Sequence, residues 1–561
     1  MDKHARTAAH APLYSASFRE NNIPPRLAAR TVIGASVTVA NGGTLIWQRH
    51  DPEGKNVDLV VCWDGEVVAT HHLPRPAVMP GESVTLHFPL AAPAGAGSHE
   101  LTLDLVQQNV TRFSDRGVET LRLRIDVDDT RTSRSAALLE RARSLSPWYY
   151  QPTQGVLESR DGRGFPHFVS KAEGCHLWDL EGRRYIDYTM GWGCALLGYA
   201  EPRVQRAIAE VLDSAAVVPF PYELEIEVAG MLTEDIPCAE MVMFGKNGSD
   251  VCTLAARVAR AFTGKRQILF CGYHGWQDWW VEQFGFAATG VPERPEPLLH
   301  RFKFNDIAGF TRLWKEHRSD LAAVMMEPAG PSQGPQGPSP DADIGFLSEV
   351  ARMAREARAL LVFDEIITGF RYPGGGVQKA TGVVPDLACF GKALSNGMPL
   401  SALVGRAEVL QRSMGQTHYG PTFRGEMYSF AAARAAMEIY RTEPVAEAVW
   451  SCGRVLRDGI NGSCRRHGVA ANCEGPPFRF TLAFAEADPM RLAMKRTLLQ
   501  QELLKAGLIT YNGFLLPSYA HRDGAVIDAT LAAVDAALAT IAEAERRNRL
   551  DRYLEIPLLP L

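Results

Sequence analysis

Apolar and polar residues alternate at every second position between Thr31 and Val127, a period typical of strands with one buried face. Clusters rich in Gly, Pro, Asn and Asp separate the alternating segments, which are ASVTVAN, VDLVVCWDG, SVTLHFPL, HELTLDLVQ and TLRLRIDV. This rhythm over about 100 residues predicts an all-β sandwich of immunoglobulin type. We assign it to residues 28–128, after a polar N-terminal arm at residues 1–27.

The pattern changes after a charged stretch at residues 129–150, for which we predict a linking helix. From there to about residue 545, helical patterns alternate with short, continuously apolar segments. Continuous apolar strands between helices are typical of a mostly parallel sheet with helices on both faces. The strand candidates are residues 240–245, 267–272, 321–327, 359–365 and 386–392.

Polar residues follow these strand candidates at the end where ligands of parallel sheets bind. Asn247, Gly248 and Ser249 follow the first candidate and begin a helix, whose unpaired amides bind anions or simply form a cap. Tyr273 and His274 follow the second, where their rings would stack on a planar ligand or pack in an aromatic turn. Both explanations remain open for each pair of features.

Asp364 and Lys392 stand at the ends of two further apolar strands. A carboxylate in that position needs a cation, which is either a structural partner or a protonated heterocyclic nitrogen. A lysine there either extends to solvent or, once desolvated, has a lowered pKa and forms an imine. The order of these features along the chain, one at each successive strand end, favours a shared site.

The stretches LVFDEIITGFR (361–371) and FGKALSNGMPLSALVG (390–405) are highly specific. With HLWDLEGRRYIDYTMGWGCALLGYAEPRV (176–204), MVMFGKNGSDVCTLAARVARAFTG (241–264), GYHGW, MMEP and GPTFRG, they resemble class III aminotransferases of fold type I that use pyridoxal phosphate (PLP). Within that family, residues 150–545 are most similar to glutamate-1-semialdehyde aminomutase-like proteins. The resemblance implies an α/β PLP-transferase fold, with a large domain at 151–430, a small C-terminal domain at 431–545 to which residues 151–215 contribute, and a tail at 546–561.

The family pattern implies catalytic roles for two residues. Lys392 would form the internal aldimine with PLP and move protons at the substrate carbon, and Asp364 would pair with the pyridinium nitrogen. Tyr273 and Ile366 would cover the two faces of the ring.

The phosphate of PLP would be held by Asn247, Gly248 and Ser249, and Thr422 would reach the phosphate of the neighbouring subunit in a homodimer. The complete cofactor-binding set that the resemblance implies is Asn247, Gly248, Ser249, Tyr273, His274, Glu327, Asp364, Ile366, Lys392 and Thr422.

The chain departs from the family pattern at three places. Ornithine- and 4-aminobutyrate-type members have a second glutamate where this chain has Ser332, so their carboxylate switch is not predicted here. The pattern TxxGNP is TFRGEM, which places Arg424 and Glu426 beside the cofactor site. Residues 509–521 lack the FEAGF pattern of the true aminomutase.

We therefore predict an aminotransferase that moves an amino group between an amino donor and a carbonyl acceptor. The alternatives are an intramolecular aminomutase of the glutamate-1-semialdehyde type, a PLP-dependent epimerase, and a non-catalytic carbohydrate-binding or assembly protein. Trp47, Trp63 and DLVQQNVTRFSDRG (104–117) resemble immunoglobulin-like modules attached to bacterial polysaccharide export and sugar-transfer proteins, which favours an acceptor from polysaccharide or secondary metabolism.

The composition bears on the partners and on the cell compartment to expect. The chain is 46% hydrophobic and 22% charged with a formal net charge of −5, which gives no reason to expect a nucleic-acid partner. It has no apolar run of membrane-spanning length and no signal peptide at its N-terminus. Ten cysteines without a CxxC pair favour reduced thiols in the cytoplasm over disulfides or a metal site.

Overall fold

The computed structural model describes residues 12–21, 23, 25–28, 32–93, 95, 97–128, 134–146, 168–281, 290–291, 296–329, 341–510 and 513–554. Predictions for residues 1–11, 129–133, 147–167 and 555–561 and for Ser332 lie outside the described residues. The chain divides into two compact units. The first comprises Met1–Val156 with the short segments Pro166–Lys171 and Trp178–Arg184, and the second comprises the other residues up to Leu561.

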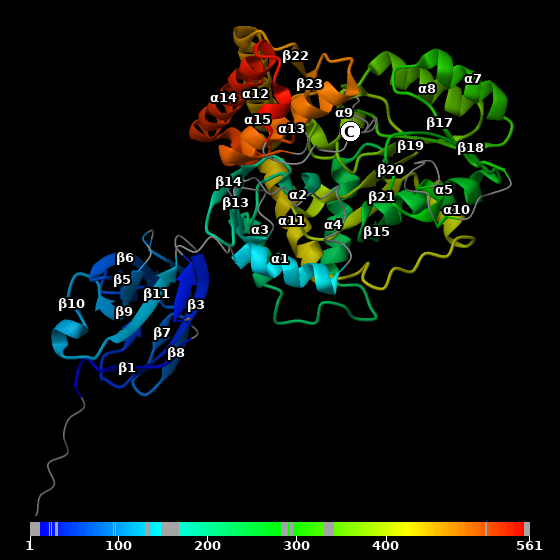
Figure 1. The fold of residues 1–561 in the computed structure, drawn as a ribbon. Helices are drawn as coiled ribbons and strands as arrows, with labels where there is room; N and C mark the ends of the chain where they lie inside the picture. Colours follow the sequence, from blue (N-terminus) through cyan, green and yellow to red (C-terminus); the bar gives the residue numbers. More distant parts are fainter. Residues whose placement is uncertain are drawn as a thin grey trace, which may run out of the picture. The chain divides into compact units, whose positions relative to one another are not determined.

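The first unit contains two larger β-sheets and a two-stranded sheet of β4 and β7, drawn in blue in Figure 1, and the predicted all-β class is confirmed. One sheet has the strand order β1-β3-β8 and the other the order β2-β11-β9-β5-β6, with β10 beside β9. Val37 and Val39 of one sheet share a core with Leu59 and Val61 of the other. The strands are β1 (Ala16–Asn21), β2 (Arg26–Ala28), β3 (Val32–Asn41), β4 (Trp47–Gln48), β5 (Val57–Trp63), β6 (Glu66–His72), β7 (Ala77–Val78), β8 (Ser83–Ala91), β9 (Gly97–Gln107), β10 (Thr111–Arg112) and β11 (Leu121–Asp128).

The arm predicted at residues 1–27 is wrong for its described part. β1 pairs antiparallel with β3, with Ala16 opposite Asn41, and β2 pairs parallel with β11. Most side chains of β1 are exposed, as is usual for an edge strand, so its sequence gives little apolar signal. Helix α1 (Arg134–Leu145) lies within the stretch for which we predict a linking helix.

A mostly parallel sheet forms the centre of the second unit (Figure 1). Its order is β15-β21-β20-β19-β18-β16-β17, and β21 alone of these runs antiparallel to both of its neighbours. All five strand candidates from the sequence are strands of this sheet, so the predicted fold class is confirmed. The sheet strands are β15 (Met241–Gly245), β16 (Gln267–Cys271), β17 (Leu299–Arg301), β18 (Leu321–Met326), β19 (Leu360–Asp364), β20 (Leu387–Phe390) and β21 (Ser401–Gly405).

Helices cover both faces of this sheet, and its central strands β16, β18, β19, β20 and β21 are buried along their whole length. On β19, Val362 belongs to a core with α5 and α10, whereas Phe363 belongs to a core with α4, α7, α8 and α11. Alternation along the strand then directs Asp364 toward α5 and Glu365 toward the other face. The helices around the sheet are α2 (Met190–Gly193), α3 (Pro202–Ala209), α4 (Glu223–Asp235), α5 (Gly248–Thr263), α6 (Asp278–Val281), α7 (Ile307–His317), α8 (Ile344–Glu356), α9 (Val377–Thr381), α10 (Ala407–Met414) and α11 (Met427–Thr442).

The C-terminal part, orange and red in Figure 1, packs three long helices on a small sheet of order β22-β23-β25. Of the described helices only α14 has the length and apolarity of a membrane span, but its apolar residues pack against α12 and α13 in this core. The elements are α12 (Val445–His467), β22 (Ala471–Glu474), β23 (Phe480–Phe484), α13 (Pro489–Lys505), β24 (Leu508–Ile509), β25 (Phe514–Leu515), α14 (Gly524–Arg546) and α15 (Leu550–Tyr553). Before the large sheet come β12 (Val169–Glu173), β13 (His176–Asp179) and β14 (Arg184–Asp187), and Ile186 of β14 pairs parallel with Leu508.

The Glu365 carboxylate is buried on the face of the sheet opposite Asp364, where hydrogen bonds satisfy it. It is fully buried and accepts hydrogen bonds from Thr368 Oγ1 (2.7 Å), the Val377 amide (2.9 Å) and the Gln378 amide (3.4 Å). Burial raises the pKa of Glu365, and these hydrogen bonds act in the opposite direction. The side chain therefore ties the segment after β19 to the start of α9.

We expect Glu365→Ala to lower the free energy of unfolding by about 3 kcal/mol, because buried donors lose their acceptor. Urea denaturation followed by circular dichroism measures the loss. Glu365→Gln keeps one acceptor oxygen and should lose less. An unchanged unfolding midpoint for Glu365→Ala would contradict this reading of the contacts.

Candidate active site

A cavity of about 730 Å³ lies in the second unit where the strands of the large sheet end. Nine of the ten residues expected to bind the cofactor line it, and they come from the segments that follow β15, β16, β18, β19 and β20. Residues of β23 and α13 form another part of the wall. Thr422 does not line this cavity; it lies exposed in the turn between α10 and α11.

Asp364 is buried at the end of β19 and its carboxylate is fixed by three contacts. His274 Nδ1 lies 2.7 Å from Oδ2, the Cys252 thiol lies 3.5 Å from the same oxygen, and the Ile366 amide donates to Oδ1 at 3.1 Å. The buried Nε2 of His274 has no hydrogen-bond partner among the described residues. These contacts hold the carboxylate in one orientation toward the cavity.

Lys392 begins the short 3-10 helix η6 (Lys392–Ser395) directly after β20 and Gly391. Its φ of 47° is unusual for a residue with a side chain and costs on the order of 1 kcal/mol. The side chain keeps some accessible area because it faces the cavity, yet the surrounding protein excludes most bulk water. This burial lowers the pKa of the Lys392 amine to about 8, with the charges of Arg479 and Arg371 acting in the same direction.

The turn between β15 and α5 presents backbone amides to the cavity. Asn247 caps α5, and its amide donates to Asp250 Oδ2 at 2.8 Å, while Gly248 and Ser249 open the first helical turn. A side chain at Gly248 would meet Ile366 at 3.2 Å, so this turn packs directly against the strand end that carries Asp364. The first turn of this 16-residue helix borders the cavity and is a site for an anion.

The turn after β16 packs against this anion site. The Trp276 amide donates to Ser249 Oγ at 3.3 Å, and a side chain at Gly275, whose φ is 119°, would approach that hydroxyl to 2.5 Å. Tyr273 lines the cavity and its amide donates to Glu327 Oε1 at 2.8 Å. The glycine thus allows the aromatic turn to approach the helix start.

These residues fit pyridoxal phosphate. The cavity offers an anion site at α5, a carboxylate with remaining acceptor capacity at Asp364, apolar contact at Ile366 and a buried amine at Lys392. Among the described residues none forms a hydrogen bond or an ion pair with that amine. A cofactor with a phosphate, a protonated ring nitrogen and an aldehyde matches each of these groups.

Sequence reasoning missed three cations that also line the cavity, which are Lys246, Arg479 and Arg496. Arg479 lies directly before β23, is 5% exposed and forms an ion pair with Glu327 at 3.2 Å, and Lys246 precedes the anion site. Lys246 and Arg479 each adjoin an apolar strand, MVMFG or FTLAF. That signal is the same one that pointed to Lys392.

The family match and the similar proteins agree on one family. The class-III aminotransferase family matches residues 158–476, more than half of the chain. The chain is 31% identical to a 3-aminobutyryl-CoA aminotransferase of Cloacimonas acidaminovorans over 386 residues, which cover 69% of this chain and 90% of that protein. It is 32% identical to a glutamate-1-semialdehyde 2,1-aminomutase of Roseiflexus castenholzii over 442 residues, covering 74% of this chain and 100% of the other.

Among solved structures, the FumI protein of Sphingopyxis sp. MTA144 in its PLP internal aldimine form has a TM-score of 0.66 and 27% identity. The similarity covers 74% of this chain and 97% of that protein. The family match begins after the β-sandwich at residues 28–128, so the kinship concerns the unit that contains the cavity. The chain belongs to the class-III aminotransferases, and it is an enzyme that uses pyridoxal phosphate for amino transfer between a small-molecule donor and a carbonyl acceptor.

Proposed function

We propose that amino transfer takes place in this cavity, with Lys392 as the residue that carries the cofactor and Asp364 as the partner of its ring nitrogen. The juxtaposition of these two side chains is the observation that supports it most. Asp364 is paired in register with Cys389 of the neighbouring strand, and Lys392 follows Cys389 by three residues. The two groups thus line the same cavity from adjacent strand ends.

Bound pyridoxal phosphate supplies a protonated ring that withdraws electrons from the substrate carbon next to the transferred nitrogen. The Lys392 amine, with its pKa lowered to about 8 by burial, would hold the cofactor and would accept and return the proton of that carbon. Asp364, held by His274 and the Ile366 amide, would pair with the ring nitrogen. Tyr273 and Ile366 would lie on the two faces of the ring.

The anion site would hold the phosphate through the amides of the first turn of α5 and the Ser249 hydroxyl. Asn247 and Gly248 contribute backbone to this site, and a helix N-terminus favours negative charge. Glu327, which accepts from the Tyr273 amide, would position the aromatic turn and does not need to touch the cofactor.

A second candidate function is an intramolecular aminomutase, supported by the full-length match to the Roseiflexus castenholzii protein. A half-reaction screen separates the two. Amines are added singly to the enzyme in its coloured form, and the cofactor spectrum is followed with and without a carbonyl acceptor. An aminotransferase loses its visible absorbance with a donor alone and regains it when an acceptor is added. An aminomutase instead converts one substrate to its isomer without any acceptor.

We further propose a cytoplasmic homodimer in which Thr422 completes the phosphate site of the partner subunit. Thr422 lies outside the cavity of its own chain, and the neighbouring Phe423 is 60% exposed. Phe220 is 79% exposed and offers further apolar surface to a partner subunit. All ten cysteines are free thiols, which supports a reducing compartment.

The lowered pKa of Lys392 predicts how the apoenzyme captures pyridoxal phosphate. Because only the neutral amine attacks an aldehyde, the capture rate should rise with pH and level off above a midpoint near 8. Stopped-flow absorbance over a series of buffers measures this profile. Lys392→Ala should remove the reaction entirely. A midpoint near 10.5, the ordinary value for lysine, would show that the reacting amine is not buried.

Asp364→Asn should leave the cofactor bound but slow the chemical step by at least about 100-fold, because the charge next to the ring nitrogen is worth about 3 kcal/mol. Single-turnover kinetics of the half-reaction measure this step apart from substrate binding. Glu365→Gln is the matched control, since that carboxylate points to the other face of the sheet. It should keep the chemical rate within a few-fold. Near-normal chemistry in Asp364→Asn would require another partner for the ring.

The dimer proposal predicts a two-subunit mass in sedimentation equilibrium and a cofactor site shared between subunits. Thr422→Ala should weaken pyridoxal phosphate binding by about tenfold, the loss expected when one hydrogen bond to a phosphate disappears. Thr417→Ala is the control, because the Thr417 hydroxyl of the same loop bonds to the Ser413 carbonyl. A monomer with full activity would refute the shared site.

A further inference from the structure

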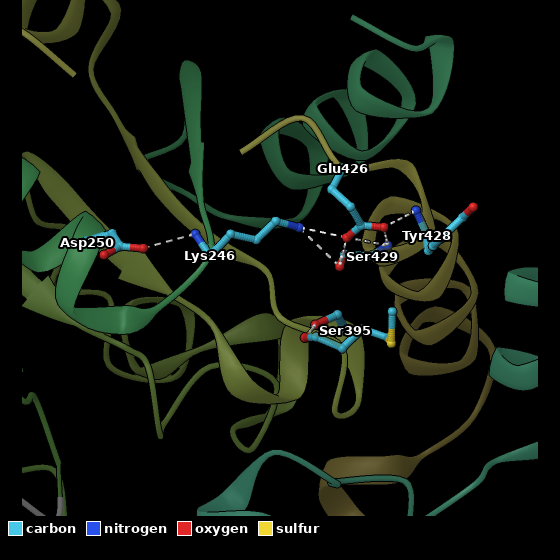
Figure 2. A network of polar contacts seen from close by, with 7 residues as sticks. Lys246, Asp250, Ser395, Glu426, Tyr428 and Ser429 are labelled. Carbon is cyan, nitrogen blue, oxygen red and sulfur yellow. Dashed lines mark hydrogen bonds and ion pairs between the residues drawn. The ribbon is translucent and has the colours of Figure 1, made fainter. Parts of the chain in front are cut away.

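Lys246 and Glu426 form an ion pair beside the proposed phosphate site (Figure 2). Lys246 Nζ lies 2.8 Å from Glu426 Oε2, and the two side chains are 12% and 13% exposed. The two residues are 180 positions apart in sequence. Lys246 stands directly before Asn247 and lines the cavity, and Glu426 is one of the two residues by which TFRGEM departs from the family pattern.

Neighbouring protein groups form further hydrogen bonds with both charged groups of the pair. Ser429 Oγ accepts from Lys246 Nζ at 3.2 Å and donates to Glu426. Glu426 is also the N-cap of α11 and accepts from the Tyr428 amide at 2.6 Å and the Ser429 amide at 3.2 Å. Lys246 thus reaches from the start of α5 to the start of α11.

Each member of the pair favours the charged form of the other. Burial lowers the pKa of Lys246 from the ordinary value of a lysine, and Glu426 acts against this shift. For Glu426, burial favours a higher pKa, but the hydrogen bonds from Lys246 and Ser429 outweigh it and hold the pKa below its usual value. In an ion pair with so little access to water, removal of one partner is costly because it leaves the other charge uncompensated.

The pair also fixes one end of the loop that carries Thr422. At the other end, Tyr419 Oη donates to the Phe244 carbonyl at 3.0 Å. Phe244 and Lys246 flank Gly245, the last residue of β15, where a side chain would approach Tyr419 Oη to 2.5 Å. The segment from Tyr419 to Glu426 is therefore attached at both ends to the strand end that leads into the anion site.

We propose that Lys246 and Glu426 are a positioning pair that sets the Thr422 turn at a fixed place relative to the phosphate-binding turn of the same subunit. This inference rests on the proposed function and on the proposed dimer. One turn serves the phosphate of its own site, and the other serves the phosphate of the partner's site. In each chain, the ion pair thus connects the turn that binds its own phosphate to the turn that reaches the phosphate of the partner subunit.

The test uses the full-length apoenzyme and pyridoxal phosphate as the probe, with affinity measured by absorbance titration. Lys246→Met removes the cation, and Glu426→Gln removes the anion while keeping an acceptor for the N-terminus of α11. Each single variant should weaken binding by at least about tenfold. The double variant should be weakened by less than the product of the two. Lys246→Arg keeps the charge and should keep an affinity close to that of the wild type.

Coupling to Thr422 separates positioning from general stabilisation. In the Lys246→Met background, Thr422→Ala should cause almost no further loss, because the turn is already displaced. The apoenzyme's melting temperature serves as the structural readout, and the increase on adding the cofactor should shrink in Lys246→Met. Lys505→Met, which removes a lysine paired with Glu502 at 3.0 Å on α13, is the matched control and should keep the cofactor affinity.

Wild-type affinity in Lys246→Met would overturn the proposal, and so would equal losses from Thr422→Ala in both backgrounds. If Lys246→Met does not fold, Lys246→Gln replaces it in the same comparisons with the same expected results. A wild-type protein that does not bind pyridoxal phosphate would instead refute the proposed function. The two failures are therefore distinguishable.

Discussion

The Lys392 amine lies in a cavity that excludes most bulk water, and no described carboxylate is close enough to form an ion pair with it. A protonated amine is costly in such a place, so burial lowers its pKa to about 8 and makes the neutral nucleophile available near physiological pH. Lys246 lines the same cavity but has Glu426 at 2.8 Å. The difference between the two lysines is therefore one of partners, and it supports the proposal that Lys392 carries the cofactor.

Two adjacent carboxylates at the end of β19 face opposite sides of the large sheet. Asp364 continues the side of β19 that faces α5, where His274 and Cys252 contact it and one oxygen keeps capacity for a ligand. Glu365 points to the other face, where hydrogen bonds from Thr368 and α9 occupy it. Alternation of side chains along a strand is thus enough to give adjacent acids different roles.

Much of this arrangement could be predicted because it depends on local patterns. Apolar segments followed by polar residues predicted the strands of the large sheet and the side chains at their ends, and nine of the expected cofactor residues line one cavity. The Lys246–Glu426 pair could not be predicted, because it joins positions 180 residues apart through tertiary packing. The edge strand β1 was missed for a local reason: most of its side chains are exposed, so its sequence has no apolar period. Arg479 gave a signal, a cation directly before an apolar strand, but its partner Glu327 is also distant in sequence.

Because two lysines line the cavity, identifying the one that carries the cofactor tests the account most directly. Borohydride reduction of the coloured enzyme fixes pyridoxal phosphate covalently to its lysine, and protease digestion with mass spectrometry locates the modified peptide. The account predicts the added mass on the peptide that contains Lys392 and none on the peptide that contains Lys246. Modification of Lys246 with an unmodified Lys392 would contradict the assignment of the site.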